Sequence, residues 1–135
     1  MAVEFPSATR EERDREVVTV KNVPMINIRD GANAHIVPGK QMTLCFATFD
    51  AHKYLPVHSH PHEQMLIILK GEMDAIRDGK RYRLHAGEVL HVPGGVPHGA
   101  QTLDSPCEAL EVFAPSREEF EAKHWEVMKR SGLLR

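Results

Sequence analysis

The stretch that decides the fold of this chain is HSHPHEQMLIILKG, which occupies residues 58–71. His58 and His60 are separated by one residue, so in an extended backbone their side chains project from the same side. A second stretch, GEVLHVPGGVPH at residues 87–98, ends on a further histidine, His98. Three imidazoles carried on two hydrophobic strands predict a pocket for a divalent cation. Gln64 lies in the first stretch, and its side-chain oxygen is the predicted fourth ligand.

The spacing of these residues resembles the two sequence motifs of the cupin superfamily. The first motif is H-x-H, three or four residues, a carboxylate or its substitute, six residues and a glycine. It is matched here by His58, His60, Gln64 and Gly71. The second motif, G-x5-P-x-G-x2-H, is matched by Gly87, Pro93, Gly95 and His98. The separation of the two motifs is also similar to that of small bacterial cupins.

This resemblance implies an all-β fold, a single antiparallel cupin barrel (a double-stranded β-helix, or jelly roll), followed by a C-terminal helix. It also implies one divalent transition metal, and neutral imidazole suits zinc, nickel, iron, manganese or copper. Many cupins have glutamate at the position of Gln64. The neutral amide leaves the site without a protein charge to offset the cation, so we expect a small anionic substrate. His52 and Thr102 depart from the motifs, and neither is a predicted ligand.

Composition limits the class of protein. The 135 residues suit one domain, and 41% hydrophobic with 27% charged residues is typical of a soluble protein. A net charge of −2 gives no basic field for nucleic acid, and no apolar run is long enough for a membrane span. No apolar signal core precedes the first charged residues, so we expect a cytoplasmic protein. Cys45 and Cys107 are expected to be buried thiols.

Three segments are expected along the chain: a charged arm at residues 1–16, a barrel at 17–115 and a helical segment at 116–135. In the arm, Thr9 and Glu12 form a capping signal, and we expect a frayed tail or a short exposed helix.

Strand signals recur through the barrel segment and begin at residues 17–20. Residues 41–49 form a long strand signal, and residues 66–69 are continuously apolar, as in a strand buried on both faces. Asp78-Gly79 predicts a two-residue hairpin turn. Two further strand signals lie at residues 89–92 and 107–113.

The helix is predicted at about residues 117–130, packed across the outside of the barrel. Ser116 and Glu119 form a capping box before it. Its apolar face consists of Phe120, His124, Val127 and Met128.

The last predicted strand carries a second informative pattern, Glu111, Phe113 and Arg117. It resembles the pectin-degradation (KdgF-type) cupins, which linearise 4,5-unsaturated monouronates into open-chain keto sugars. In that family an aspartate, a phenylalanine and an arginine at these relative positions line the pocket beside the metal. Glu111 replaces the aspartate and is longer by one methylene group. The resemblance implies catalytic roles for Glu111, Phe113 and Arg117.

These residues suit the chemistry that the resemblance implies, and each also has a simpler reading. A carboxyl group beside a metal can shuttle protons, and an arginine can hold a carboxylate through two parallel hydrogen bonds. Alternatively, Arg117 lies solvated on the first turn of the helix, and Phe113 is plain core. His62 is expected at the rim of the site or supporting it. The remaining histidines are expected to be structural or on the surface: His35, His52, His85, His91 and His124.

Three classes of function follow from these residues, because one scaffold can host unrelated activities. We favour a metal-dependent enzyme that acts on a small sugar acid such as an unsaturated monouronate. The alternatives are another metal cupin enzyme, such as a dioxygenase or a lyase, and a non-catalytic small-molecule-binding cupin. We also expect a homodimer, formed through the early strands and exposed methionine and valine residues.

Overall fold

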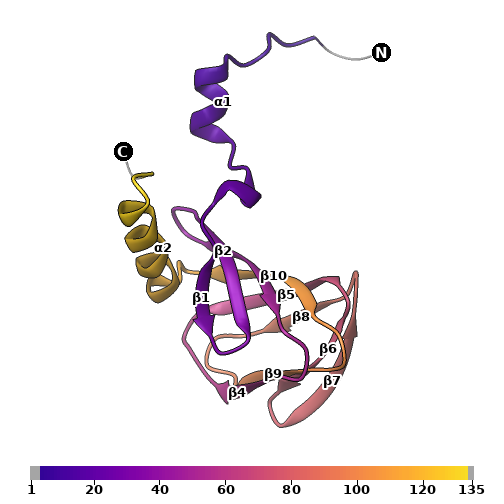
Figure 1. Cartoon of the computed structure of the whole chain (residues 1–135). Helices are drawn as coiled ribbons and strands as arrows, with labels where there is room; N and C mark the ends of the chain where they lie inside the picture. Colours follow the sequence, from indigo (N-terminus) through magenta and orange to yellow (C-terminus); the bar gives the residue numbers. More distant parts are fainter. Residues whose placement is uncertain (1–3, 134–135) are drawn as a thin grey trace.

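The fold is an antiparallel barrel made of two facing sheets, in a computed structural model that describes residues 4–133 (Figure 1). The larger sheet has six strands in the order β1-β2-β3-β10-β5-β8. Their bounds are Ile26–Arg29, Ala32–Pro38, Thr43–Phe49, Cys107–Ala114, Glu63–Lys70 and Val89–Val92. The smaller sheet has the order β4-β9-β6-β7, with bounds Tyr54–His58, His98–Thr102, Glu72–Arg77 and Lys80–His85. The predicted all-β barrel is confirmed.

The core lies between the two sheets because inward side chains alternate with outward ones along each strand. In β3 the inward positions are buried and the outward positions half-buried, which is the alternation expected of a two-layer barrel. Each fully buried large aliphatic or aromatic side chain contributes about 1.5–3 kcal/mol relative to an exposed one. The largest fully buried apolar side chains are Phe113, Ile36, Ile68, Met73 and Val92. Cys45 and Cys107 are free, buried thiols, as predicted.

Two of the predicted strand features are wrong. Residues 17–20 form no strand; a short 3-10 helix, η1, occupies Val20–Asn22 and leads into β1. The apolar run 66–69 does lie in β5, but this strand is buried on one face only. Met65 and Leu69 are exposed, because no described segment covers the outer face of the larger sheet at β5.

The hairpin predicted at Asp78-Gly79 is confirmed, and it joins β6 to β7. Both residues have positive φ, 50° and 80°, which is the conformation of the type I′ turn that matches the twist of paired strands. Glycine tolerates this region without strain and aspartate tolerates it better than most residues.

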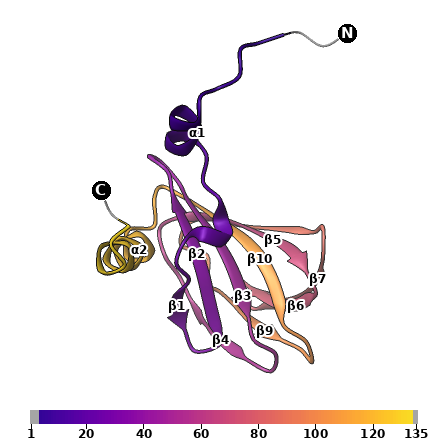
Figure 2. The ribbon, with the colours of Figure 1, turned by 45° about the horizontal axis from the view of Figure 1, so that its top comes forward.

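The charged arm contains a short helix, α1, at Arg10–Glu16, so the expected exposed helix is confirmed. Thr9 and Glu12 cap it reciprocally, as predicted. None of its residues is buried, and the arm projects away from the barrel in both views (Figures 1 and 2).

The C-terminal helix α2 spans Glu118–Arg130 and contacts β1 and β2, with Phe120 and His124 buried. The predicted capping box is wrong, because Arg117 is the N-cap residue and makes no side-chain cap. The Ser116 hydroxyl instead faces the carbonyl of Lys40, and the Glu119 carboxylate binds the Arg117 side chain. Neither helix in the described residues is long and apolar enough to cross a membrane.

Candidate metal centre and cavity

Three histidines converge at one end of the barrel, as their spacing predicted. His58 ends β4 and His98 begins β9, and these two residues are direct partners across the smaller sheet. His60 follows in the loop after β4 and is buried. One ring nitrogen from each of the three histidines lies within 4.8 Å of the others. This spacing is compact enough for all three nitrogens to bind one cation.

The backbone fixes the orientation of each ring. The Nδ1 atoms of His58, His60 and His98 lie 3.0, 3.1 and 2.8 Å from the carbonyl oxygens of Pro56, His62 and Val96. A carbonyl can only accept, so in each ring the proton is placed on Nδ1 and the lone pair on Nε2. Metal-binding histidines use this arrangement, in which the second ring nitrogen donates to a carbonyl or carboxylate.

Gln64 lies beside the three histidines, on β5 of the facing sheet, where it can act as the fourth ligand. Its side chain is buried, and its Oε1 lies 3.2 Å from Nε2 of His60. Nε2 of His98 is buried without a hydrogen-bond partner in the described chain. Buried polar atoms are normally paired, so an unpaired nitrogen facing three other donors fits a bound cation. Three imidazoles and one amide oxygen suit a divalent transition metal.

Burial holds the histidines in their neutral form. It lowers the pKa of His58 and of His98, and it lowers the pKa of His60 to about 4. The positive charge of Arg117 is the second cause at His60. At neutral pH the lone pairs are therefore available to a cation.

His62 lies outside the cluster and supports it. Its carbonyl oxygen orients the His60 ring, and its own Nε2 lies 3.6 Å from the Glu118 carboxylate at the start of α2. Among the other histidines, His124 is buried in α2, His35 is half-buried and bonds the carbonyl of Val23, and His52, His85 and His91 are exposed beside carboxylates.

A cavity opens behind the cluster, between the two sheets. The volume inside it that water-sized molecules can reach is about 70 Å³, enough for several waters or a small ligand group. Its walls are mostly apolar, and its polar lining comprises Arg29, Cys45, His58, Gln64, His98, Glu111 and Arg117.

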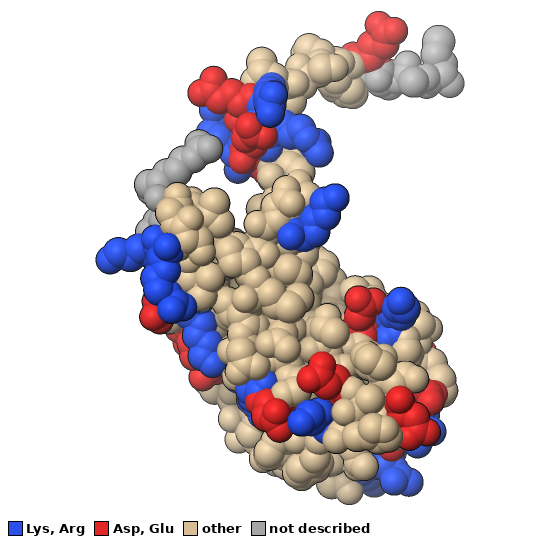
Figure 3. Space-filling view, in the orientation of Figure 1, with Lys and Arg blue, Asp and Glu red and all other residues tan. Residues whose placement is uncertain are grey.

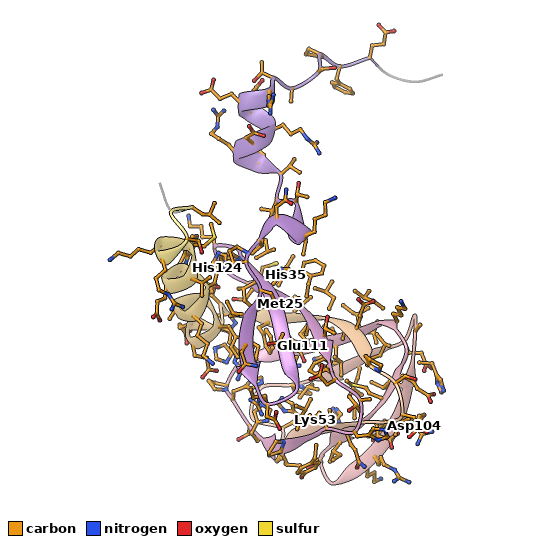
Figure 4. All side chains as sticks on the ribbon, in the orientation of Figure 1. Met25, His35, Lys53, Asp104, Glu111 and His124 are labelled. Carbon is orange, nitrogen blue, oxygen red and sulfur yellow. The ribbon has the colours of Figure 1, made fainter. Side chains whose placement is uncertain are left out.

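Glu111 projects from β10 into the interior of the barrel (Figure 4). Burial raises the pKa of its carboxyl group, while the nearby Arg117 charge and a hydrogen bond with the Cys45 thiol partly oppose that rise. Cys45 is its direct partner on β3. A raised pKa brings a carboxyl group closer to the pH at which an enzyme works, which suits a proton-transfer group.

Arg117 is not solvated on the first turn of α2. Its side chain is 5% exposed, and its guanidinium carbon lies 4.9 Å from the ring centre of Phe113 and 4.2 Å from that of Phe120. Nε donates to Glu119 at 2.6 Å. In the described chain no protein group accepts a hydrogen bond from its two terminal nitrogens, so these are available to a ligand. Phe113 is fully buried and also contacts the His60 ring.

Comparison with known proteins now adds to this geometry. The family model for the cupin domain matches residues 45–113, just over half of the chain. The chain is a cupin. The matched region runs from Cys45 to Phe113 and includes all four predicted ligands.

Several solved cupins have the same fold. An RmlC-like cupin from Shewanella frigidimarina is 25% identical, with a TM-score of 0.73 over 78% of this chain and 95% of that chain. KdgF from a Halomonas species is 22% identical, with a TM-score of 0.68 over 72% and 90% of the two chains. At that identity the likeness shows the fold alone.

One curated relative matches a shorter stretch. Dimethylsulfoniopropionate lyase DddQ from Ruegeria pomeroyi is 40% identical over 58 residues, which are 42% of this cupin and 29% of the lyase. The match therefore spans less than a third of that relative's length.

Sequence reasoning missed one polar residue of this cupin's cavity, Arg29. Strand alternation places Ile26 and Ile28 inward and would turn Arg29 outward. The pairing of β1 with β2 instead shifts between Asn27 and Arg29, so that Arg29 lies opposite Ala32. Such bulges re-aim side chains, and here Arg29 joins the cavity lining. No pattern in the sequence marks this irregularity.

Proposed function

We propose that this cupin is a metal-dependent enzyme that linearises a small unsaturated sugar acid, a 4,5-unsaturated monouronate, into an open-chain keto sugar. One observation carries the proposal. Glu111, with a raised pKa, and Arg117, whose two terminal guanidinium nitrogens have no acceptor in the described chain, line the same cavity as His58, Gln64 and His98. That set offers a proton-transfer group, a carboxylate-binding group and a cation site within one apolar chamber.

The reaction is an isomerisation, so no atom is gained or lost overall. The anomeric hydroxyl group gives up its proton, and its oxygen forms a carbonyl with the anomeric carbon. The bond between that carbon and the ring oxygen breaks, and the ring oxygen keeps the electron pair as an enolate. The enolate becomes a ketone when the distal alkene carbon takes up a proton. One carboxyl group can remove the first proton and deliver the second.

Glu111 is the group that moves this proton, and Arg117 holds the substrate carboxylate. The stacking of Arg117 on Phe113 and Phe120, together with its bond to Glu119, fixes the direction of its guanidinium group. A bound cation at His58, His60, Gln64 and His98 would supply Lewis-acid polarisation of substrate oxygens. The walls around Glu111 are mostly apolar.

A lyase that acts on a sulfonium acid is the second candidate, and the similarity to DddQ favours it. Removal of a proton from the carbon beside a carboxylate would use the same base and the same arginine. The charges of this cavity favour it less, because a sulfonium cation would meet Arg29 and Arg117 with Glu111 as the single carboxylate of the lining.

The test is an assay of the purified, metal-loaded protein with 4,5-unsaturated galacturonate and, in parallel, dimethylsulfoniopropionate. Loss of the alkene absorbance faster than the spontaneous opening supports the uronate proposal. Release of dimethyl sulfide alone would replace it with the lyase. If neither substrate is consumed but both bind, the non-catalytic binding cupin replaces both enzymes.

A further inference from the structure

We propose that Arg29, supplied by β1, is a second oxyanion-binding residue of the cavity beside Arg117, and that the cavity therefore takes short organic acids with two anionic or strongly accepting oxygen groups. This rests on the proposed function only in placing the substrate carboxylate at Arg117. A hydroxyl group of the same sugar acid would then bind Arg29.

Arg29 lies opposite Ala32, which in turn pairs with Phe49 at the end of β3. The backbone of Arg117 is bound to Thr43, at the start of β3. The two backbones are thus anchored at opposite ends of one strand, while both side chains line the same cavity.

Arg29 is half-buried, and in the described chain it makes no salt bridge and its side chain donates no hydrogen bond to protein. The neighbouring Asp30 is bound to Lys53 instead. A guanidinium group carries five donors in a planar fork, and a half-buried one without an acceptor is ready to bind carboxylate or hydroxyl oxygens.

A regular β1 would place Arg29 on the outer face of the sheet, where water would solvate it. The irregularity between Asn27 and Arg29 turns it inward at the cost of one regular pair. Bulges occur preferentially beside binding sites, where they redirect a side chain.

The experiment compares succinate with butyrate, which have equal chain length but two and one carboxylates. Calorimetric titration of the metal-loaded protein should give succinate at least about tenfold tighter, as expected for one added charged hydrogen-bonded pair. Arg29→Met should abolish this preference, so that succinate binds no more tightly than butyrate. Arg29→Lys should retain part of it.

Arg81→Met is the matched control, because Arg81 is an exposed arginine of β7 outside the cavity lining. Metal content and melting temperature establish that each variant folds. A wild type without preference for succinate, or a preference that survives in Arg29→Met, would overturn the inference. Because the readout is binding, failure of the uronate assay does not affect it.

An independent observation concerns the outer face of the larger sheet. Strand registers align two rows of side chains across five strands of this sheet. We name them the outer rows; they consist of Val37, Leu44, Val112, Met65 and His91, and of His35, Phe46, Leu110, Ile67 and Val89. None is an acid, a lysine or an arginine, and Figure 3 shows a broad surface without these charges below the arm.

We infer that the outer rows form the interface between two copies of this chain. A two-fold axis places the same rows against each other, so the patch is its own complement. Standard interfaces use roughly 20–30 residues on each side, more than the outer rows provide. In this proposal the charged arm supplies the remaining interface residues. An isolated helix as short as α1 is unstable in water, and no residue of α1 is buried against the described part of its own chain.

Sedimentation equilibrium tests this interface. Wild type should be a dimer at micromolar concentration, and Met65→Lys and Val89→Lys should each shift it toward monomer. Tyr82→Lys is the control, since Tyr82 is exposed to a similar extent as Met65 but lies in β7 of the other sheet. Removal of residues 1–18 should weaken the dimer without abolishing it. A monomeric wild type, or a dimer unaffected by both outer-row variants, would overturn the proposal.

Discussion

The backbone N–H of Arg117 donates a hydrogen bond of 2.8 Å to Oγ1 of Thr43, 74 residues earlier in the chain. The same hydroxyl group donates to the Glu121 carboxylate in the first turn of α2. One buried threonine at the start of β3 therefore attaches the helix to the barrel and positions Arg117 at the cavity.

Thr43→Val should keep the shape of this residue and remove both hydrogen bonds. The Arg117 N–H and the Glu121 carboxylate would lose a partner, so unfolding free energy should fall by about 1–3 kcal/mol. Butyrate should also bind more weakly, because Arg117 would be less firmly placed. Urea unfolding measures the first effect and calorimetry the second. Thr48→Val, at an outward position of the same strand, is the control.

His60→Ala should abolish stoichiometric metal after dialysis, because it removes one of the three imidazoles, the strongest donors of the predicted set, and leaves a cavity in place of that ligand. His62→Ala should keep the metal, because the carbonyl that orients His60 belongs to the backbone and survives the change. Elemental analysis of the two dialysed variants measures the metal content of each. Unchanged metal in His60→Ala would refute the ligand set, and its loss from His62→Ala would show that His62 is a ligand.

Glu111→Gln keeps the side-chain size and hydrogen-bonding capacity but removes the titratable proton. If the proposed reaction is correct, turnover of the unsaturated uronate should fall by roughly 10²–10⁴-fold. Metal content should not change, because Glu111 is outside the histidine cluster. An unaltered turnover number would exclude Glu111 as the proton-transfer group.

Arg117→Lys keeps the positive charge and loses the planar fork that binds both oxygens of a carboxylate. We expect KM to rise more than kcat falls, since the contact is present in the ground state and the transition state alike. Steady-state kinetics on the same uronate gives both constants. A fall confined to kcat would instead assign Arg117 to the transition state.

Metal-free protein should lose stability as the pH falls from about 6.5 to about 4. Burial lowers the pKa of His60 to about 4, so over this window the unfolded chain takes up a proton that the folded chain does not. The loss from His60 should be about 1–3 kcal/mol. Glu111 has the opposite effect on stability. Its pKa is raised in the folded protein, so the folded protein takes up this proton more readily than the unfolded chain and gains stability as the pH falls.

The difference in unfolding free energy between wild type and His60→Gln isolates the histidine contribution. This difference in unfolding free energy should become smaller as the pH falls, because wild type loses the His60 contribution and glutamine does not titrate. A difference that is constant between pH 4 and pH 7 would contradict the neutral, buried His60.

The histidine cluster could be predicted because its geometry is local. His58 and His60 are two residues apart on an extended segment, and such a pair projects from one side whatever the rest of the chain does. The motif spacing supplied His98 and Gln64. The Asp78-Gly79 turn was predictable for the same reason, since two residues determine its φ values.

The helix start was mispredicted because a local pattern competed with distant partners. Ser116 and Glu119 have capping-box spacing, but Thr43 satisfies the Arg117 N–H and the Arg117 side chain takes the Glu119 carboxylate. Both bonds place Arg117 in the cavity, a position that a sequence window around residue 117 does not contain.

The sequence by itself determined the barrel, the three histidines and the acid on the last strand, because alternation and motif spacing act over a few residues. The tertiary structure alone decided that Arg117 is buried over Phe113 and Phe120, that one face of β5 is uncovered, and that Arg29 turns inward. Each of these depends on the pairing of distant segments. The bulge that aims Arg29 exists only in the register between β1 and β2.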